Sequence, residues 1–480
     1  MTISGLVQAG KVCQEKFDSF FASLENLEKK YSSKLKFCVV SGTSQQSALK
    51  RFDLLQTAFK RKKRADMFDG FAYEYGGRFI DKDRKFHEIG EDVSLSDGER
   101  GSVLQIAKKF KIQVDPCYEL YMNFDGEENN SDLRAFTKEC EKKLKGLDVV
   151  YFNDKDGVGC DIKKPALNKG LFLKWYLKDK APELIVVGGD AAEDLDMLAD
   201  LPQTEFYFVG FASSNLNQNK TSKFMSALDN IDGIVDGLTA ITKYSMKHYT
   251  FDVYNIKTNA SEMLRCYDFI VELLKKHKIT SLGKPNIVPY YYGKVKEDDG
   301  ISLFCFLEPI GHITMHNFER RGKAYIDIFT SADLDFGKLK KQLTKFLSAG
   351  AVDGKKLEFN MCDLVASKNA FGPHFILETC NDSELTLTDV FAFLDKLPQA
   401  IKMTPITLPH VYENDEAIWG IRLIAESHIS LYYLKKFNYI FVDVFSCVMD
   451  SVDLIKAELN KMFPNAKMQL YIRGGKYEEK

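Results

Sequence analysis

The sequence predicts a mixed protein: a doubly wound α/β domain with an inserted cap, followed by two α+β sandwich units. In the first half, short apolar runs rich in β-forming residues end at polar loops, and helical patterns flank them. In the second half, one segment recurs 116 residues later without a gap, which indicates a duplicated unit. We expect domains at residues 1–236, 240–362 and 363–480, with the cap at about 90–165.

Composition places the chain among ordinary globular proteins. Of its 480 residues 45% are hydrophobic and 28% charged, and the net charge of −2 argues against nucleic-acid or membrane binding. Ten cysteines without a Cys-x-x-Cys pair indicate a reducing compartment. No uncharged run approaches the roughly 20 residues of a membrane span. We therefore expect a cytoplasmic protein with a small-molecule substrate, whose protein partner is a second copy or a paralogue.

Two apolar runs of the first half end where a site is expected. Residues 35–40 end at Ser41, and residues 184–187 end at a Gly-Gly-Asp turn that contains Asp190. Buried parallel strands place their carboxyl ends at one edge of a sheet, where ligands bind. Helical patterns on either side complete the α/β expectation.

These loops resemble motifs of the haloacid-dehalogenase phosphatases, in particular the sucrose-phosphatase and phosphomannomutase-like branch. The resemblance implies that Ser41 hydrogen-bonds a phosphate and that Lys169 neutralises its charge. It also implies that Asp190 and Asp194 are carboxylate ligands of Mg²⁺, a hard cation that prefers oxygen. Residues of the cap would close over this site.

The nucleophile of that family has no counterpart here. The family places an Asp-x-Asp motif on a strand before the serine motif, whereas the only Asp before Ser41 is Asp18, in a helical pattern. Without such a carboxylate no phosphoaspartyl intermediate can form. We expect a degenerate domain whose remaining motifs hold the loops in shape. A sugar-phosphate phosphatase is the alternative for this domain.

The two copies of the repeat differ where chemistry would occur. Residues 311–316 and 427–432 align, and so do the strands and the amphipathic helix that follow each. At most one copy can be a complete site, because three aligned pairs differ: Gly311 and Ser427, His316 and Tyr432, Ser331 and Cys447.

The second copy resembles the bacterial-type S-adenosylmethionine decarboxylases. Its motif is Glu426-Ser427-His428-Ile429-Ser430, followed 20 residues after the serine by Cys447 at the end of an Asp-Val-Phe-Ser-Cys strand. The family's opening strand, with a histidine near its start, resembles residues 372–378 in this copy and 247–252 in the first. The resemblance covers about 245–480.

This resemblance implies that the chain cuts itself between Glu426 and Ser427, and that Ser427 becomes a pyruvoyl group. Such a group is the electron sink that decarboxylation requires. Cys447 would protonate the product carbon, and His428, Tyr432 and His316 are further candidates for the site. The implied activity is decarboxylation of S-adenosylmethionine for spermidine synthesis, or of a related amino acid.

Two departures leave a second function open. The family's histidine five residues after the serine is Tyr432 here, and a phenol with a pKa near 10 is a poor base. The family's serine eight residues before it is Trp419, whereas copy 1 retains His316. The alternative is a catalytically inactive paralogue that binds or regulates a partner. Ser427, Cys447 and His316 would then have structural roles, Cys447 as a small buried hydrophobe.

We expect the two copies to pair as a pseudo-dimer. Each has one amphipathic helix and alternating strands such as residues 324–329. A single copy would expose its helix-bearing face and its sheet edges, so we expect the partner copy to cover them.

Overall fold

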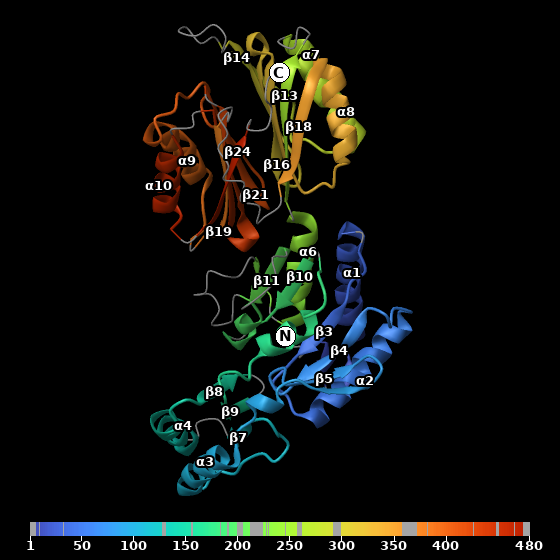
Figure 1. Ribbon diagram of the computed structural model, residues 1–480, viewed down its shortest axis with the longest axis vertical. Coiled ribbons are helices and arrows are strands. Elements are labelled where there is room, and N and C mark those ends of the chain that lie inside the picture. The colour runs from blue at the N-terminus through green and yellow to red at the C-terminus, as the bar shows by residue number, and fades with distance from the viewer. Residues whose placement is uncertain are drawn as a thin grey trace. The chain divides into compact units, whose positions relative to one another are not determined.

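The computed structural model divides the chain into two compact units (Figure 1). The first comprises residues 1–218 and 226–238, and the second comprises 219–225 and 239–480. The structure describes residues 6–8, 10–31, 33–126, 131–154, 157–182, 184–189, 192–198, 205–211, 224–226, 228, 230–244, 246–256, 262–290, 299–357, 372–381, 383–425, 427–447, 451–464 and 466–473. Among these residues no helix is both long and apolar enough to cross a bilayer.

Parallel strands and helices build the core of the first unit. Strand β3 pairs in parallel with β4, which continues into β5 and β6, and β10 pairs in parallel with β11. Val40, Phe172 and Val187 lie in one hydrophobic cluster, so strands of both sheets share a core with α5. The elements are β1 (Val7–Gln8), β2 (Lys11–Val12), α1 (Gln14–Tyr31), β3 (Phe37–Val40), α2 (Gln45–Arg61), β4 (Phe68–Tyr73), β5 (Arg78–Asp81), β6 (Phe86–Glu88), α5 (Lys169–Leu177), β10 (Leu184–Gly188), the 3₁₀ helix η2 (Ala192–Leu198), β11 (Glu205–Phe211), β12 (Phe224–Ser226) and α6 (Asn230–Tyr244).

An α+β segment is inserted between β6 and α5. Its strands form an antiparallel sheet in the order β7-β9-β8, and Phe124 and Phe136 belong to its own hydrophobic cluster. Ser96 and Glu99 form a capping box, which fixes the start of its first helix. The elements are η1 (Glu91–Val93), α3 (Asp97–Phe110), β7 (Met122–Gly126), α4 (Ser131–Lys143), β8 (Asp148–Asp154) and β9 (Gly157–Lys163).

The second unit contains two copies of one αβ arrangement. The sheet of copy 1 has the order β14-β15-β16-β17-β13-β18, and that of copy 2 has the equivalent order β20-β21-β22-β23-β19-β24. Copy 1 consists of β13 (Lys247–Ile256), α7 (Met263–His277), β14 (Asn286–Tyr290), β15 (Gly300–Phe306), β16 (Gly311–Phe318), η5 (Glu319–Arg321), β17 (Lys323–Thr330), α8 (Phe336–Leu347) and β18 (Ala349–Leu357). Copy 2 consists of β19 (Gly372–Cys380), α9 (Leu387–Ala400), β20 (His410–Glu413), β21 (Ala417–Ile424), β22 (Ser427–Leu434), η6 (Lys435–Phe437), β23 (Tyr439–Ser446), α10 (Val452–Met462) and β24 (Lys467–Arg473).

Each copy packs its own two helices on one face of its sheet. In α8, Leu339, Leu343 and Leu347 recur every four residues and are buried in the cluster of copy 1. Copy 2 has a separate cluster in which Ile455 and Leu459 of α10 meet its strands. Strand residues alternate between faces, so every second side chain turns away from the helices. The fold class is thus the predicted one.

The copies meet through the helix-free faces of their sheets, which corrects our expectation about the pairing (Figure 1). Rings of Phe329 and Phe441 lie 5.6 Å apart across this contact, and the Trp419 indole donates a hydrogen bond to the carbonyl oxygen of Leu307. The helices already cover the apolar faces within each copy. What remains to be covered is the opposite face, where aromatic and polar side chains alternate.

Candidate functional site

Ser427 begins strand β22 in an unusual backbone conformation. Its φ is 156°, in the positive range that L-residues avoid, and its side chain is 2% exposed. Its hydroxyl has no hydrogen-bond partner among the described residues. A buried hydroxyl without a hydrogen-bond partner costs free energy. The backbone angle and the hydroxyl of Ser427 are therefore both in unfavourable states. Glu426, the predicted cleavage partner, lies outside the described residues.

Copy 1 has Gly311 at the same position, with φ of 130°. A Cβ atom there would lie 2.0 Å from the carbonyl oxygen of Phe329 on the neighbouring strand. Glycine is therefore the residue that fits this backbone in copy 1. In copy 2 the equivalent residue is Ser427, which has a side chain. The backbone of Ser427 is therefore strained at this position.

Cys447 lies at the same end of the sheet as Ser427. Ser427 pairs with Ser446 in the register of β22 and β23, and Cys447 follows directly. Cys447 is half-buried. The copy 1 equivalents, Gly311 and Thr330, show the same register, so the duplication extends to this end of each sheet.

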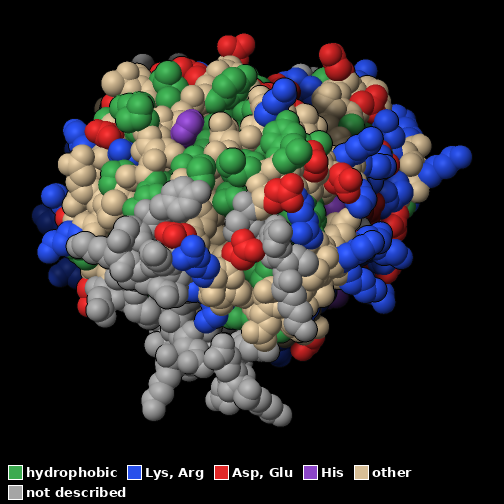
Figure 2. Space-filling view, turned by 90° about the horizontal axis from the view of Figure 1, so that it is seen from above, with side chains coloured by type: hydrophobic (Ala, Val, Ile, Leu, Met, Phe, Trp, Pro, Cys, Tyr) green, Lys and Arg blue, Asp and Glu red, His purple; other side chains and the backbone are tan. Residues whose placement is uncertain are grey.

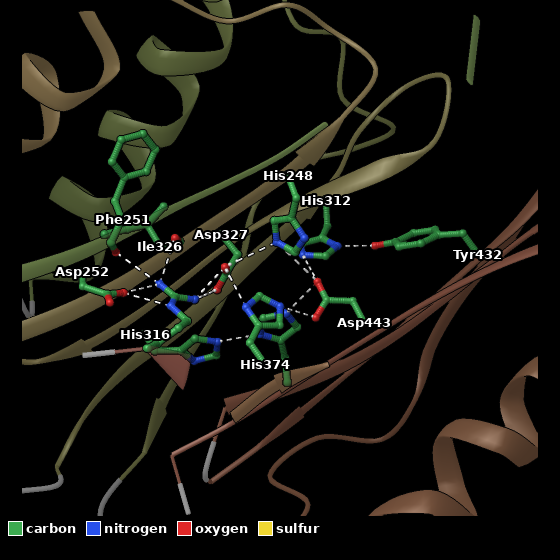
Figure 3. Close-up of polar contacts among 12 residues, drawn as sticks. His248, Phe251, Asp252, His312, His316, Ile326, Asp327, His374, Tyr432 and Asp443 are labelled. Carbon is green, nitrogen blue, oxygen red and sulfur yellow. Dashed lines mark hydrogen bonds and ion pairs between the residues drawn. The ribbon is translucent and has the colours of Figure 1, made fainter. Parts of the chain in front are cut away.

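Tyr432 points into the contact between the two sheets (Figure 3), and His428 lies on the same face of β22 because side chains alternate along a strand. His428 Nδ1 lies 3.0 Å from His316 Nε2. On its other side, His316 Nδ1 lies 2.9 Å from the Ser302 hydroxyl. The Tyr432 hydroxyl lies 2.6 Å from His312 Nδ1. The structure therefore brings His428 and His316 together and engages Tyr432 with a histidine of copy 1.

Burial shifts the pKa values of two histidines and one tyrosine in this layer. It lowers the pKa of His312 to about 3 and that of His316 well below its ordinary value, so both imidazoles are neutral. It raises the pKa of Tyr432 well above that of an ordinary phenol. Tyr432 is thus unsuited to act as a base at neutral pH.

Buried ions complete the layer. Arg473 from copy 2 contacts both carboxylate oxygens of Asp327 at 2.6 Å and Oδ1 of Asp252 at 2.6 Å, both in copy 1. Burial raises the pKa of Asp327, but Arg473 and then His374 outweigh it and hold the pKa well below its ordinary value. Burial also opposes ionisation of Asp443, and His374 and His248 outweigh it in the same way.

Sequence reasoning missed most of this layer as a site. The chain has eight histidines, and five lie in this layer: His248, His312, His316, His374 and His428. Each of these five histidine residues is at most 4% exposed to solvent. The molecular surface in Figure 2, by contrast, shows apolar, basic and acidic side chains intermixed. The available signal was polar residues at every second position of otherwise apolar strands, as in His312-x-Thr314-x-His316.

In the first unit the structure pairs two of the four predicted residues. Lys169 Nζ lies 2.7 Å from Asp194 Oδ1, and both side chains are buried. The Ser41 hydroxyl accepts a hydrogen bond from the Thr43 backbone N–H. Asp190 lies outside the described residues.

A cavity of about 700 Å³ separates β3 from β10. Its lining includes Cys38 and Val40 of β3 and Ile185 and Val187 of β10. Among the described residues β3 pairs only with β4, and no strand lies between β3 and β10. Asp18 lies in α1 and forms an ion pair with Lys62 at 2.7 Å.

A second buried carboxylate of the first unit was not predicted. Asp161 Oδ2 accepts a hydrogen bond from the Tyr75 hydroxyl at 2.5 Å, and Oδ1 accepts one from Asn123 at 2.7 Å. Burial raises the pKa of Asp161 to about 6, although both hydrogen bonds oppose the shift. The contact joins the inserted segment to the turn after β4.

The S-adenosylmethionine decarboxylase family model matches residues 247–358 and 374–471, one segment in each copy. A similar curated protein is the S-adenosylmethionine decarboxylase proenzyme of Prochlorococcus marinus (strain MIT 9211), 32% identical over 79 residues. That match covers 16% of this chain and 65% of the relative.

Solved structures similar to this chain include a decarboxylase and two phosphatases. The adenosylmethionine decarboxylase of Aquifex aeolicus is 22% identical with a TM-score of 0.21, over 23% of this chain and 98% of its own. The trehalose-6-phosphate phosphatase of Aspergillus fumigatus is 14% identical with a TM-score of 0.31, over 46% and 82%. A haloacid-dehalogenase subclass IIB sugar phosphatase is 12% identical with a TM-score of 0.34, over 49% and 95%.

Proposed function

We propose that the second unit is a self-processing, pyruvoyl-dependent decarboxylase of S-adenosylmethionine that serves spermidine synthesis. The observation that carries the proposal is Ser427, whose buried hydroxyl has no partner among the described residues and whose backbone is strained. The family match on both sides of this serine supports it, and so does the relative that is named a proenzyme.

Self-processing needs chemistry that Ser427 can supply. Its Oγ attacks the carbonyl carbon of residue 426, and the peptide bond rearranges to an ester. Elimination then leaves a new carboxyl terminus on residue 426, and hydrolysis releases ammonia and leaves a pyruvoyl group at residue 427. Cleavage relieves the positive φ of Ser427, because its amide bond no longer exists. The hydroxyl does not first have to give up a hydrogen bond to a described residue.

The pyruvoyl group would supply the electron sink for the carbon that loses carbon dioxide. In this chain Cys447 would hold the proton for that carbon, since it follows the partner of Ser427 in the strand register. We do not assign the base of the elimination to Tyr432, because its pKa is raised and its hydroxyl contacts His312.

The test is release of labelled carbon dioxide from carboxyl-labelled S-adenosylmethionine by the full chain. Ser427→Ala should abolish both release and cleavage. Ser430→Ala is the matched control for cleavage, since it removes an equally buried serine on the same strand and should leave the chain cut. A Ser427→Ala protein that releases carbon dioxide at the wild-type rate would exclude the proposal.

A non-catalytic paralogue that binds or regulates a partner is the second candidate. Tyr432 favours it, because the position of the family's histidine is taken by a phenol engaged with copy 1. An uncut chain without decarboxylase activity would establish this reading.

For the first unit we propose a role without phosphoryl transfer. Lys169 forms an ion pair with Asp194, and the Ser41 hydroxyl accepts a hydrogen bond from the Thr43 backbone, which supports a structural role for both side chains. Among the described residues no strand lies between β3 and β10, and a cavity lined by both strands lies there. We also propose 1–236, 240–362 and 363–480 as domain limits.

A further inference from the structure

Carboxylates outnumber guanidinium groups in the polar layer between the two sheets. This layer contains three carboxylates, Asp252, Asp327 and Asp443, against one guanidinium, Arg473, and all four are buried. The carboxylates of these four groups outnumber the guanidinium by two. Charge buried in a protein interior is costly unless it is paired or bound to a metal.

Three ligand atoms converge on one point of this layer without bonding to one another. Asp443 Oδ2 lies 3.6 Å from His312 Nε2 and 3.7 Å from His428 Nε2, and all three atoms lie within 4.8 Å of one another. None has a hydrogen-bond partner within the described part of the chain. These separations are too long for hydrogen bonds. They are close to the ~3.4 Å expected between ligands of one tetrahedral Zn²⁺ with bonds of about 2.1 Å.

The opposite atom of each group is held in place. His312 Nδ1 lies 2.6 Å from the Tyr432 hydroxyl, and His428 Nδ1 lies 3.0 Å from His316 Nε2. Asp443 Oδ1 lies 2.7 Å from His374 Nε2. When each Nδ1 carries the proton, each Nε2 presents its lone pair to the common point. Such outer partners orient the ligands of protein metal sites.

We propose that His312, His428 and Asp443 bind a divalent transition-metal ion, Zn²⁺ in the first place, and that this ion ties the two copies together. Imidazole and carboxylate ligands suit Zn²⁺. A divalent cation would place positive charge beside the buried carboxylate of Asp443. His248 Nε2, 3.6 Å from the same Oδ2, is a further donor beside the site.

The ion has a structural role. His312 belongs to copy 1, whereas His428 and Asp443 belong to copy 2, so the ligands join the two sheets. None of the three is more than 3% exposed, which leaves no open position for substrate. The site does not depend on the proposed decarboxylase activity, because Ser427 points to the other face of β22.

The test is the metal content of the full chain, purified without chelator and after removal of any affinity tag. Elemental analysis should find about one first-row transition-metal ion per chain, and chelation should lower the thermal unfolding temperature until Zn²⁺ is returned. Co²⁺ added to the stripped protein should give the visible absorption of tetrahedral coordination. A chain that carries no such metal and binds neither Zn²⁺ nor Co²⁺ would overturn the proposal.

Variants locate the site. His312→Gln and His428→Gln should lose the ion, whereas His410→Gln, in which the altered histidine lies outside this layer, should keep it. Tyr432→Phe removes only an outer partner and should weaken binding by about 10- to 100-fold. This variant tests the site if the ligand variants do not fold.

Ser427→Ala should keep the full metal content whether or not the wild-type chain is cut, so this result is independent of the decarboxylase proposal. Wild-type metal affinity in both His312→Gln and Tyr432→Phe would contradict the assignment.

Discussion

The first residue of two equivalent strands, β16 in copy 1 and β22 in copy 2, distinguishes the copies. Gly311 and Ser427 both have positive φ, but only Ser427 carries a hydroxyl, buried and without a partner among the described residues. The sequence alone predicts this difference, since both residues follow from the 116-residue offset. It does not predict which atoms contact Tyr432, because His312 lies 120 residues away in the other copy.

The proposed role of Cys447 in turnover can be tested separately from self-cleavage of the chain. We predict that Cys447→Ala still cuts itself but turns over S-adenosylmethionine more slowly, by about 10²- to 10⁴-fold, because a general acid is lost. Mass spectrometry reports cleavage, and release of labelled carbon dioxide reports turnover. Ser331→Ala, at the equivalent position of copy 1, is the control and should keep wild-type turnover. Equal rates in Cys447→Ala and wild type would assign the cysteine to packing.

Asp161 predicts a pH dependence of the first unit. Its folded pKa of about 6 lies above its unfolded value of 3.8, so the folded state binds the proton more tightly. Stability is therefore lost as pH rises from about 4 to above 6, by about 3 kcal/mol in the free energy of unfolding. Asp161→Asn does not titrate and should lack this contribution, while its side chain can still accept the Tyr75 hydroxyl proton.

Urea unfolding between pH 4 and 7 measures this effect. Trp175 belongs to the first unit and Trp419 to the second, and these are the two tryptophans of the chain. In a Trp419→Phe background, fluorescence of Trp175 follows the first unit alone. The difference in stability between Asp161→Asn and its parent should grow as pH rises through 6. A difference that stays constant from pH 4 to 7 would show that Asp161 does not titrate in this range.

At the scale of elements, repetition and alternation in the sequence predict the second unit well. Residues 324–329 were expected as a strand and lie in β17, and the stripe from Leu339 to Leu347 lies on α8. What repetition could not predict is the face through which the copies meet. An alternating strand has two faces, and side chains such as His312 and Asp327 do not resemble an interface core in sequence. Arg473, the partner of Asp327, is remote from it in the chain.

A prediction about phosphatase activity follows from the strands of the first unit. Since no strand separates β3 from β10 among the described residues, and Asp18 is paired with Lys62 on α1, we predict no phosphatase activity. The measurement is phosphate release from a panel of sugar phosphates with Mg²⁺. Release that is lost in Asp190→Ala would contradict the prediction.

At the scale of the molecule, the chain forms two compact units, and the second contains both copies of the repeat. The contact between the copies contains Arg473 with its two carboxylates, the histidine layer and aromatic rings such as Phe329 and Phe441. The repeat in the sequence predicts two copies. Their four-layer arrangement depends on contacts more than 100 residues apart, which no local pattern specifies.

We predict that neither copy is soluble and functional alone. Residues 363–480 expressed by themselves should aggregate or remain uncut, because the inner face would expose Tyr432, Phe441 and a buried arginine without its carboxylates. Co-expression with residues 240–362 should restore solubility. Should residues 363–480 prove soluble, monomeric and self-cleaved, the duplication would be unnecessary for fold and chemistry.

The central claim is that Ser427 turns one of two similar copies into a self-processing site, and the intact mass of the purified chain tests it most directly. Cleavage before Ser427 would release the last 54 residues, about 6 kDa of the 54.7 kDa chain, with a pyruvoyl group at the new N-terminus. The account predicts these two fragments in wild type and only the uncut chain in Ser427→Ala. A wild-type chain that stays at 54.7 kDa would contradict it.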